Sequence, residues 1–162
     1  MTFIPRHPVV DVMFLKFASS PTETRPIPAG RVVTITGDRT VDTVSTANSD
    51  VALGWLMQKV KDPYTDLPTN AVFRSDLGSS DAFVGDPVGI AMGPGAIYET
   101  DQYVDEATDG IAAGTELGVD NNGKLSDTDA DSATGGTTAV ALNTLTATQT
   151  AAGKMLLIKA LL

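Results

Sequence analysis

Apolar and polar residues alternate along two stretches of this sequence that share one layout. The first is IPAGRVVTITGDRTV at 27–41, and the second is IAAGTELGVDNNGKL at 111–125. Each begins with Ile, a small residue and Ala-Gly, and continues with apolar residues at alternate positions. Each then turns at Gly, Asp or Asn and ends on an apolar residue. A period of two around such a turn is typical of a β-hairpin, so the sequence predicts two similar hairpins.

The stretch SDVALGWLMQKVKD at 49–62 fits two different periods. Apolar residues at alternate positions from Leu53 to Met57 suit a strand, whereas those spaced by four from Ala52 to Val60 suit a helix. We predict a strand, because Gly54 interrupts the helical pattern and the neighbouring sequence is rich in strand-forming residues. The helix remains the alternative.

The middle of the chain predicts a loop followed by a third hairpin. Pro, Gly, Asp, Thr and Ser dominate residues 62–82, which suits a loop with one short strand at 71–74. Apolar runs at 88–92 and 96–99 are separated by Gly-Pro-Gly, a sequence typical of tight turns. These two runs are therefore predicted to pair with each other.

The end of the chain combines a polar loop with two apolar segments. Residues 126–138, SDTDADSATGGTT, contain no apolar side chain larger than Ala and are predicted to form an acidic loop. AVALNTL at 139–145 and KMLLIKALL at 154–162 are predicted strands. The last is apolar on both faces, as expected of a strand that is covered on two sides or buried at a subunit contact.

The first 28 residues differ from the rest because they hold five of the nine prolines. Proline lacks a backbone N–H and biases the residue before it towards an extended conformation, so we predict an extended N-terminal arm. Between the prolines, VVDVMFLKF at 9–17 is too apolar to remain in water. Two interpretations stay open: the segment packs as a strand on its own core, or it covers a neighbouring subunit.

Composition supports an all-β protein with a single core. The chain has 162 residues, of which 42% are hydrophobic and 19% charged, and residues that favour helices are scarce. We predict an arm at 1–28 and a single β domain at 29–162. The domain is expected to be a compact β-barrel or β-sandwich-like structure built from hairpins.

Charge and cysteine content exclude several classes of function. The formal net charge of −9, with no cluster of Lys or Arg, repels phosphate backbones, so we expect no nucleic-acid partner. The chain has no cysteine, which rules out thiol catalysis and disulfides. Residues 1–20 are interrupted by Pro, Asp and Lys and make a poor export signal, and no apolar run is long enough to span a bilayer. We therefore expect no membrane association.

No pattern in the sequence predicts an active site. His7 is the only histidine and lies in the predicted arm, where a general base would not be held in place. The alternating carboxylates Asp127, Asp129 and Asp131 match the start of a calcium loop. However, Ser132 stands where that loop needs Gly, and Thr138 where it needs Glu. We predict that the protein is not an enzyme and has no cofactor or metal, although calcium binding by the 126–138 loop stays open.

The arrangement of these segments resembles the capsid decoration, or cement, proteins of tailed bacteriophages. The resemblance covers about residues 26–162 and rests on PAGRVVTITGD, DPVGIAM, AGTELGVDNNGKL and the ending AVALNTLTATQTAAGKMLLIKALL. It implies a virion structural protein, usually a homotrimer, that is made in the host cytoplasm and binds the outer surface of the phage head. There it would stabilise the head by clamping neighbouring major capsid protein subunits. The 1–28 arm and the 62–82 loop are additions to the family pattern.

Under this interpretation the predicted arm supplies the contact with the capsid or a neighbouring subunit. The residues predicted to be buried in that contact are its large apolar ones: Phe3, Ile4, Val9, Val12, Phe14 and Phe17. Two alternatives come from other classes of protein. One is the trimeric base of a head fibre, and the other is a secreted adhesion module stabilised by calcium.

Overall fold

The computed structural model describes residues 3–6, 11–23, 25–46, 50–61, 81–128 and 136–162. Strands form almost all of the regular structure in these residues, and the one helix among them, α1 (Ala147–Ala151), is five residues long. The predicted all-β class is therefore confirmed. No helix within the described ranges is long and apolar enough to cross a membrane.

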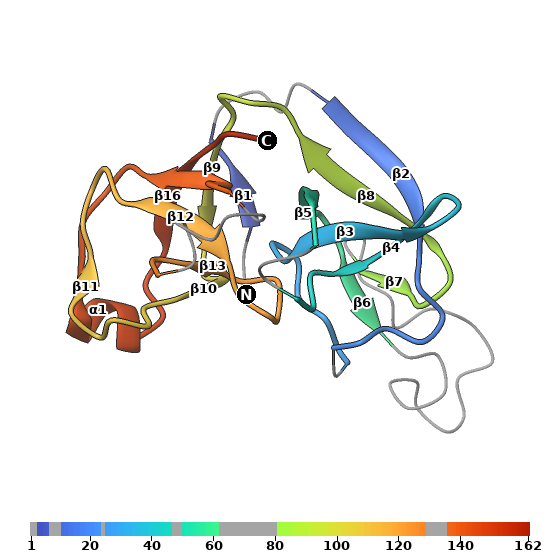
Figure 1. The fold of residues 1–162 in the computed structure, drawn as a ribbon, viewed down its shortest axis with the longest axis horizontal. Helices are drawn as coiled ribbons and strands as arrows, with labels where there is room; N and C mark the ends of the chain where they lie inside the picture. The colour runs from blue at the N-terminus through green and yellow to red at the C-terminus, as the bar shows by residue number, and fades with distance from the viewer. Residues whose placement is uncertain (1–2, 7–10, 24, 47–49, 62–80, 129–135) are drawn as a thin grey trace.

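Five strands close into a small barrel, which lies on the right in Figure 1. In chain order they are β2 (Asp11–Phe17), β3 (Val32–Gly37), β4 (Thr40–Thr43), β5 (Ala52–Leu56) and β8 (Pro87–Met92). Around the barrel the order is β2-β4-β3-β5-β8. Next to the barrel, β6 (Lys59–Lys61) and β7 (Asp81–Phe83) form a parallel pair.

A seven-stranded sheet forms the other half of the molecule, on the left in Figure 1. In spatial order its strands are β1 (Phe3–Pro5), β9 (Ile97–Thr100), β16 (Leu156–Ala160), β14 (Ala139–Ala141), β12 (Glu116–Val119), β13 (Leu125–Ser126) and β10 (Tyr103–Val104). At the far end of this half, β11 (Gly110–Ile111) pairs with β15 (Leu145–Thr146), which leads into α1.

The two hairpins predicted from the repeated pattern are both present, one in each half. The first is β3–β4 in the barrel, and the second is β12–β13 in the large sheet. The Ala-Gly that precedes each hairpin has the same role in both. Gly30 and Gly114 have φ angles of 91° and 92°, a left-handed conformation that favours glycine. The repeat in the sequence is therefore a repeat in local structure.

The third predicted hairpin is wrong, although both of its strands exist. β8 pairs with β2 and β5 in the barrel, whereas β9 pairs with β1 and β16 in the large sheet. The Gly-Pro-Gly segment between them carries the chain from one half to the other. Its backbone bonds to the C-terminal strand region: Gly93 N–H donates to the Leu162 carbonyl, and Gly95 N–H to that of Ala160.

The other predicted segments have mixed outcomes. Residues 49–62 contain β5 and β6, so the strand is confirmed and the helix is not formed. The predicted strands at 139–145 and 154–162 correspond to β14 with β15 and to β16. The prediction missed α1, whose start carries a capping box between Thr146 and Gln149. The predicted strand at 71–74 and most of the 126–138 loop lie outside the described residues.

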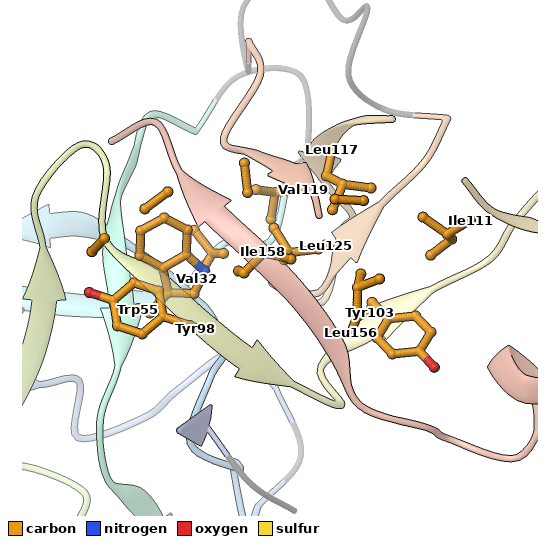
Figure 2. Close-up of a cluster of buried hydrophobic side chains, with 14 of the residues drawn as sticks. Val32, Trp55, Tyr98, Tyr103, Ile111, Leu117, Val119, Leu125, Leu156 and Ile158 are labelled. Carbon is orange, nitrogen blue, oxygen red and sulfur yellow. The ribbon is translucent and has the colours of Figure 1, made fainter. Parts of the chain in front are cut away.

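The barrel and the large sheet share one hydrophobic core. Val32 and Trp55 from the barrel wall pack with Tyr98 and Ile158 from the sheet, and all four are 0% exposed (Figure 2). The Trp55 and Tyr98 rings lie 5.6 Å apart, and Phe3 of β1 stacks on Tyr98 at 4.4 Å. A second cluster fills the barrel itself. The aromatic contacts therefore connect the two halves through apolar packing.

Candidate contact surface

The strand β2 is the most exposed apolar element in the described part of the chain. Val12, Met13 and Phe14 are 43%, 39% and 68% exposed, whereas most large apolar side chains elsewhere are buried. Successive residues of a strand point to opposite faces, so exposure of all three means that this part of β2 is uncovered on both faces. In Figure 1 it lies at the outer border of the barrel.

Strand pairing explains this exposure. β2 pairs with β8 over its length from Asp11 to Lys16, but it pairs with β4 only at Lys16 and Phe17. The first half of β2 therefore extends beyond the closed part of the barrel, and among the described strands it has a neighbour on one side only. This segment belongs to the predicted arm, and the structure places it as a strand on the protein's own barrel.

The six residues predicted to make contacts fall into different environments. Phe3 and Ile4 are half-buried in β1, which is hydrogen-bonded to β9. Phe17 is 0% exposed and belongs to the barrel core. Val12 and Phe14 are exposed, and Val9 lies outside the described residues. The contact surface among the described residues is therefore the exposed half of β2.

Phe14 lies on one outer face of the ribbon formed by β2 and β8. A Cβ atom placed at Gly89, which is opposite Phe14 in β8, would lie 3.5 Å from Phe14 Cε1 and 3.5 Å from Met57 Sδ. The ring and the thioether thus flank the glycine and make an apolar surface across β8. We call Val12, Phe14 and Met57 the β2 patch.

Sequence patterns did not predict a second apolar surface at the β3–β5 end of the barrel. Ile35 and Val51 are 58% and 73% exposed, and they line a pocket of about 320 Å³ together with Leu53. The alternation of residues 32–36 predicts that Ile35 and Val33 lie on the same side of the strand, yet Val33 is buried. The β-bulge between Ile35 and Gly37 and the short pairing partner β5 leave Ile35 uncovered instead.

Three carboxylates gather on the other half of the molecule. One oxygen from each of Asp105, Asp109 and Asp127 lies within 4.8 Å of the others. Oxygens so arranged suit a hard cation such as Ca²⁺. Two of these residues also have structural roles: Asp105 accepts hydrogen bonds from Gly110 N–H at 2.9 Å and Thr150 Oγ1 at 2.7 Å, and Asp127 accepts one from Glu106 N–H at 3.0 Å. The sequence pattern indicated a different group, Asp127 with Asp129 and Asp131. Of these three, Asp129 and Asp131 lie outside the described residues.

A buried ion pair lies near the N-terminal side of β3. Arg31 Nη2 donates to Glu23 Oε1 at 2.6 Å, with the two side chains 8% and 15% exposed. Burial raises the pKa of the Glu23 carboxyl, and this effect exceeds the opposite effect of Arg31. The same burial lowers the pKa of Arg31, against the attraction of Glu23 and Asp120.

The sequence matches no known protein-family model, and no curated protein is similar to it.

Proposed function

We propose that this protein is a virion structural protein that binds the outer surface of a phage head. As a homotrimer, it would stabilise the head by contacting neighbouring major capsid protein subunits. The observation that carries the proposal is the exposed half of β2, which presents Val12, Met13 and Phe14 to solvent on a closed barrel. Such side chains stabilise a contact when a partner covers them.

Burial of this surface would contribute favourable free energy at each contact. Complete burial of an apolar side chain contributes about 1.5–3 kcal/mol. Three partly exposed side chains give a modest gain for one molecule. A shell offers many equivalent positions, and a trimer that makes several such contacts at once binds more tightly than a single copy.

The charge of the chain favours the outside of a shell that contains nucleic acid. A formal net charge of −9 repels packaged DNA and keeps unbound copies apart in solution. The exposed half of β2 is apolar, which suits a protein partner. The acidic charge of the rest of the chain disfavours contact with nucleic acid.

Binding to expanded, undecorated heads tests the proposal. Wild-type protein should sediment with the heads, and the double variant Val12→Ser/Phe14→Ser should bind at least tenfold more weakly, since about 1.4 kcal/mol corresponds to a factor of ten. The matched control is Leu142→Ser/Leu161→Ser, which changes two side chains that are 39% and 43% exposed on the other half of the molecule. Wild-type protein that stays in the supernatant contradicts the proposal.

Point variants are preferable to deletion of the predicted arm. Residues 3–5 and 11–17 supply one strand to the large sheet and one to the barrel, and Phe17 lies in the barrel core. A chain that lacks these residues loses both strands and is expected to unfold. Loss of binding by such a chain would report the loss of its structure.

A calcium-stabilised adhesion module is the second candidate, and the group of Asp105, Asp109 and Asp127 favours it. Calcium titration against the melting temperature separates the two candidates. A rise of several degrees that the Asp109→Asn variant loses supports adhesion. An unchanged melting temperature removes the observation on which this candidate depends.

A further inference from the structure

We propose that the open edge of β2 pairs in antiparallel fashion with the same edge of a second copy of this chain, across a two-fold axis. This inference goes beyond the proposed function, because it concerns the backbone of β2 and a two-fold contact that is separate from the contacts of the proposed trimer. It rests on three observations: the direction of the backbone groups, the register that these groups allow, and the charges at the two ends of the edge.

The hydrogen bonds of β2 show which backbone groups face the open edge. Lys16 and Ala18 donate their N–H groups to the carbonyls of Arg39 and Val41, at 3.0 Å and 2.9 Å, and so face β4. Phe17 donates to the Asp86 carbonyl at 2.9 Å on the opposite side, where β8 lies. Since alternate residues of a strand direct their backbone groups to the same side, Val12 and Phe14 face the β4 side.

The position of Gly89 confirms this direction independently. Gly89 lies opposite Phe14, but its N–H donates to Gln58 Oε1 at 2.8 Å and its carbonyl accepts from Met57 N–H at 2.9 Å. Both of its backbone groups therefore point away from β2. Because β4 begins only at Thr40, which is level with Lys16, none of the strands that the structure describes lies beside the Val12 and Phe14 groups on this side. This is an open edge of the kind that accepts another strand.

One register satisfies all of these groups at once. In an antiparallel ladder, two opposite residues of a hydrogen-bonded pair exchange both of their N–H···O bonds. If Val12 lies opposite Phe14 of the second copy, then Phe14 lies opposite Val12 of that copy. The four open N–H groups then meet four open carbonyls. The edge is thus complementary to itself, which is the requirement of a two-fold contact.

Charges at the ends of the edge favour the same register. This register places Asp11 of the second copy opposite Leu15. The next residue, Lys16, donates its N–H to the carbonyl of Arg39, which directly precedes β4. Lys16, Arg39 and Asp38, all exposed, carry two positive charges and one negative charge at this end. The exposed Asp11 therefore meets a net positive end in both copies. Exposed ion pairs add little affinity, but they help to select a register.

Pairing would also enlarge the β2 patch. Val12 and Phe14 lie on one face of β2, and their side chains stay on that face when the edge is covered. The patches of the two copies would then adjoin across the new ladder and form one continuous apolar surface. Pairing through the β2 edge would therefore leave the β2 patch free to bind a shell protein.

Sedimentation velocity over a range of protein concentrations tests the pairing. Wild-type protein should associate through this edge as the concentration rises, so that its sedimentation coefficient increases. Val12→Pro removes one open N–H but leaves Met13 and Leu15, the donors to β8, intact, and we expect it to lose this concentration-dependent association. Val12→Ala loses its side chain and keeps its N–H, so it should still pair. Arg39→Asp should weaken pairing, and Asp11→Arg in the same chain should restore it.

Amide hydrogen exchange keeps the test decisive if Val12→Pro fails to fold. The Val12 and Phe14 amides of wild-type protein should exchange rapidly when dilute and slowly when concentrated, while Leu15 stays protected throughout. Rapid exchange of Val12 and Phe14 at every concentration, or pairing by Val12→Pro equal to that of wild type, overturns the inference. A third outcome also overturns it: wild-type protein shows no concentration-dependent association, and Val12→Pro binds heads more weakly than Val12→Ala. The edge would then belong to the shell protein. The head-binding result for Val12→Ser/Phe14→Ser judges the proposed function separately.

Discussion

At the scale of single residues, two buried tyrosines of the large sheet differ in their hydrogen bonding. Tyr103 donates its hydroxyl to the Lys154 carbonyl at 2.7 Å, whereas the buried Tyr98 hydroxyl has no partner among the residues that the structure describes. An unpaired buried hydroxyl costs free energy, and a paired one contributes to stability. The same residue type is therefore expected to have opposite effects on stability at two positions of one sheet.

We expect Tyr98→Phe to leave the free energy of unfolding unchanged or to increase it. Tyr103→Phe should lower it by about 0.5–1.5 kcal/mol, the usual net contribution of one hydrogen bond. Urea denaturation of both variants measures the difference. A larger loss for Tyr98→Phe than for Tyr103→Phe would show that the Tyr98 hydroxyl has a favourable partner.

Gly123 connects the two similar hairpins by a close approach. It has a φ of 72°, and its carbonyl accepts from Val32 N–H at 2.8 Å. A Cβ atom at Gly123 would lie 2.7 Å from the Val32 carbonyl oxygen. Gly153 has a similar φ of 63° but nothing within 4 Å of its Cβ position, which makes it a matched control.

We predict that Gly123→Ala destabilises the protein more than Gly153→Ala. Both variants carry the cost of a left-handed alanine, about 1–2 kcal/mol. Only Gly123→Ala must also push β3 away from the β12–β13 turn. Equal melting temperatures for the two variants would mean that the turn moves freely away from β3.

The buried Glu23 gives stability a dependence on pH. Its pKa is raised in the folded protein, so the folded state binds a proton more readily than the unfolded state. The contribution of Glu23 is fully present below its unfolded pKa and is lost as the pH rises through the folded pKa. We expect the stability of wild type, relative to Glu23→Gln, to fall between acid and neutral pH. Denaturation at several pH values measures this difference, and a rise over that range contradicts the burial effect.

At the scale of elements, β2 has two halves with different roles. Its first half is exposed and paired on one side, and its second half closes the barrel between β8 and β4. Phe14 is 68% exposed and Phe17 is 0% exposed, although only two residues separate them. The strand therefore combines a contact surface and a core position in seven residues.

Substitution of these two phenylalanines tests the division. We expect Phe14→Ala to change the free energy of unfolding by no more than about 0.5 kcal/mol, as for most surface positions. Phe17→Ala should lower it by about 3–5 kcal/mol, because it leaves a cavity in the barrel. If Phe14→Ala destabilises the protein as much as Phe17→Ala, the first half of β2 is covered within the molecule.

Local patterns predicted strands better than they predicted pairing. The 27–41 and 111–125 hairpins follow from alternation and turn residues within one short segment. β8 and β9 had the same local signals, but β8 has partners in β2 and β5, which are distant in sequence. Gly93 and Gly95 bond to the C-terminal end of the chain, and no local signal indicates that contact.

The candidate contact surface was predicted only in part, because its details also depend on pairing between segments that are distant in sequence. Apolar residues between prolines indicated that 9–17 makes an important contact, but they could not show that Phe17 is buried and Phe14 exposed. That difference depends on where β4 begins beside β2. The grouping of Asp105 and Asp109 with Asp127 also depends on folding that brings distant segments together.

At the scale of the whole molecule, one core connects a barrel that carries the β2 patch to a sheet that carries the acidic cluster. Val32 and Trp55 on the barrel side and Tyr98 on the sheet side hold the two halves together. The β2 patch is therefore presented on a packed scaffold. A scaffold of this kind suits a protein that acts by binding to a surface.

Thermal rupture of phage heads tests the central claim most directly. Expanded heads that are decorated with wild-type protein should release their DNA at a higher temperature than bare heads. Heads that are mixed with Val12→Ser/Phe14→Ser should rupture at the temperature of bare heads. If wild-type protein leaves the rupture temperature unchanged, it does not stabilise the shell, and the proposed function is wrong.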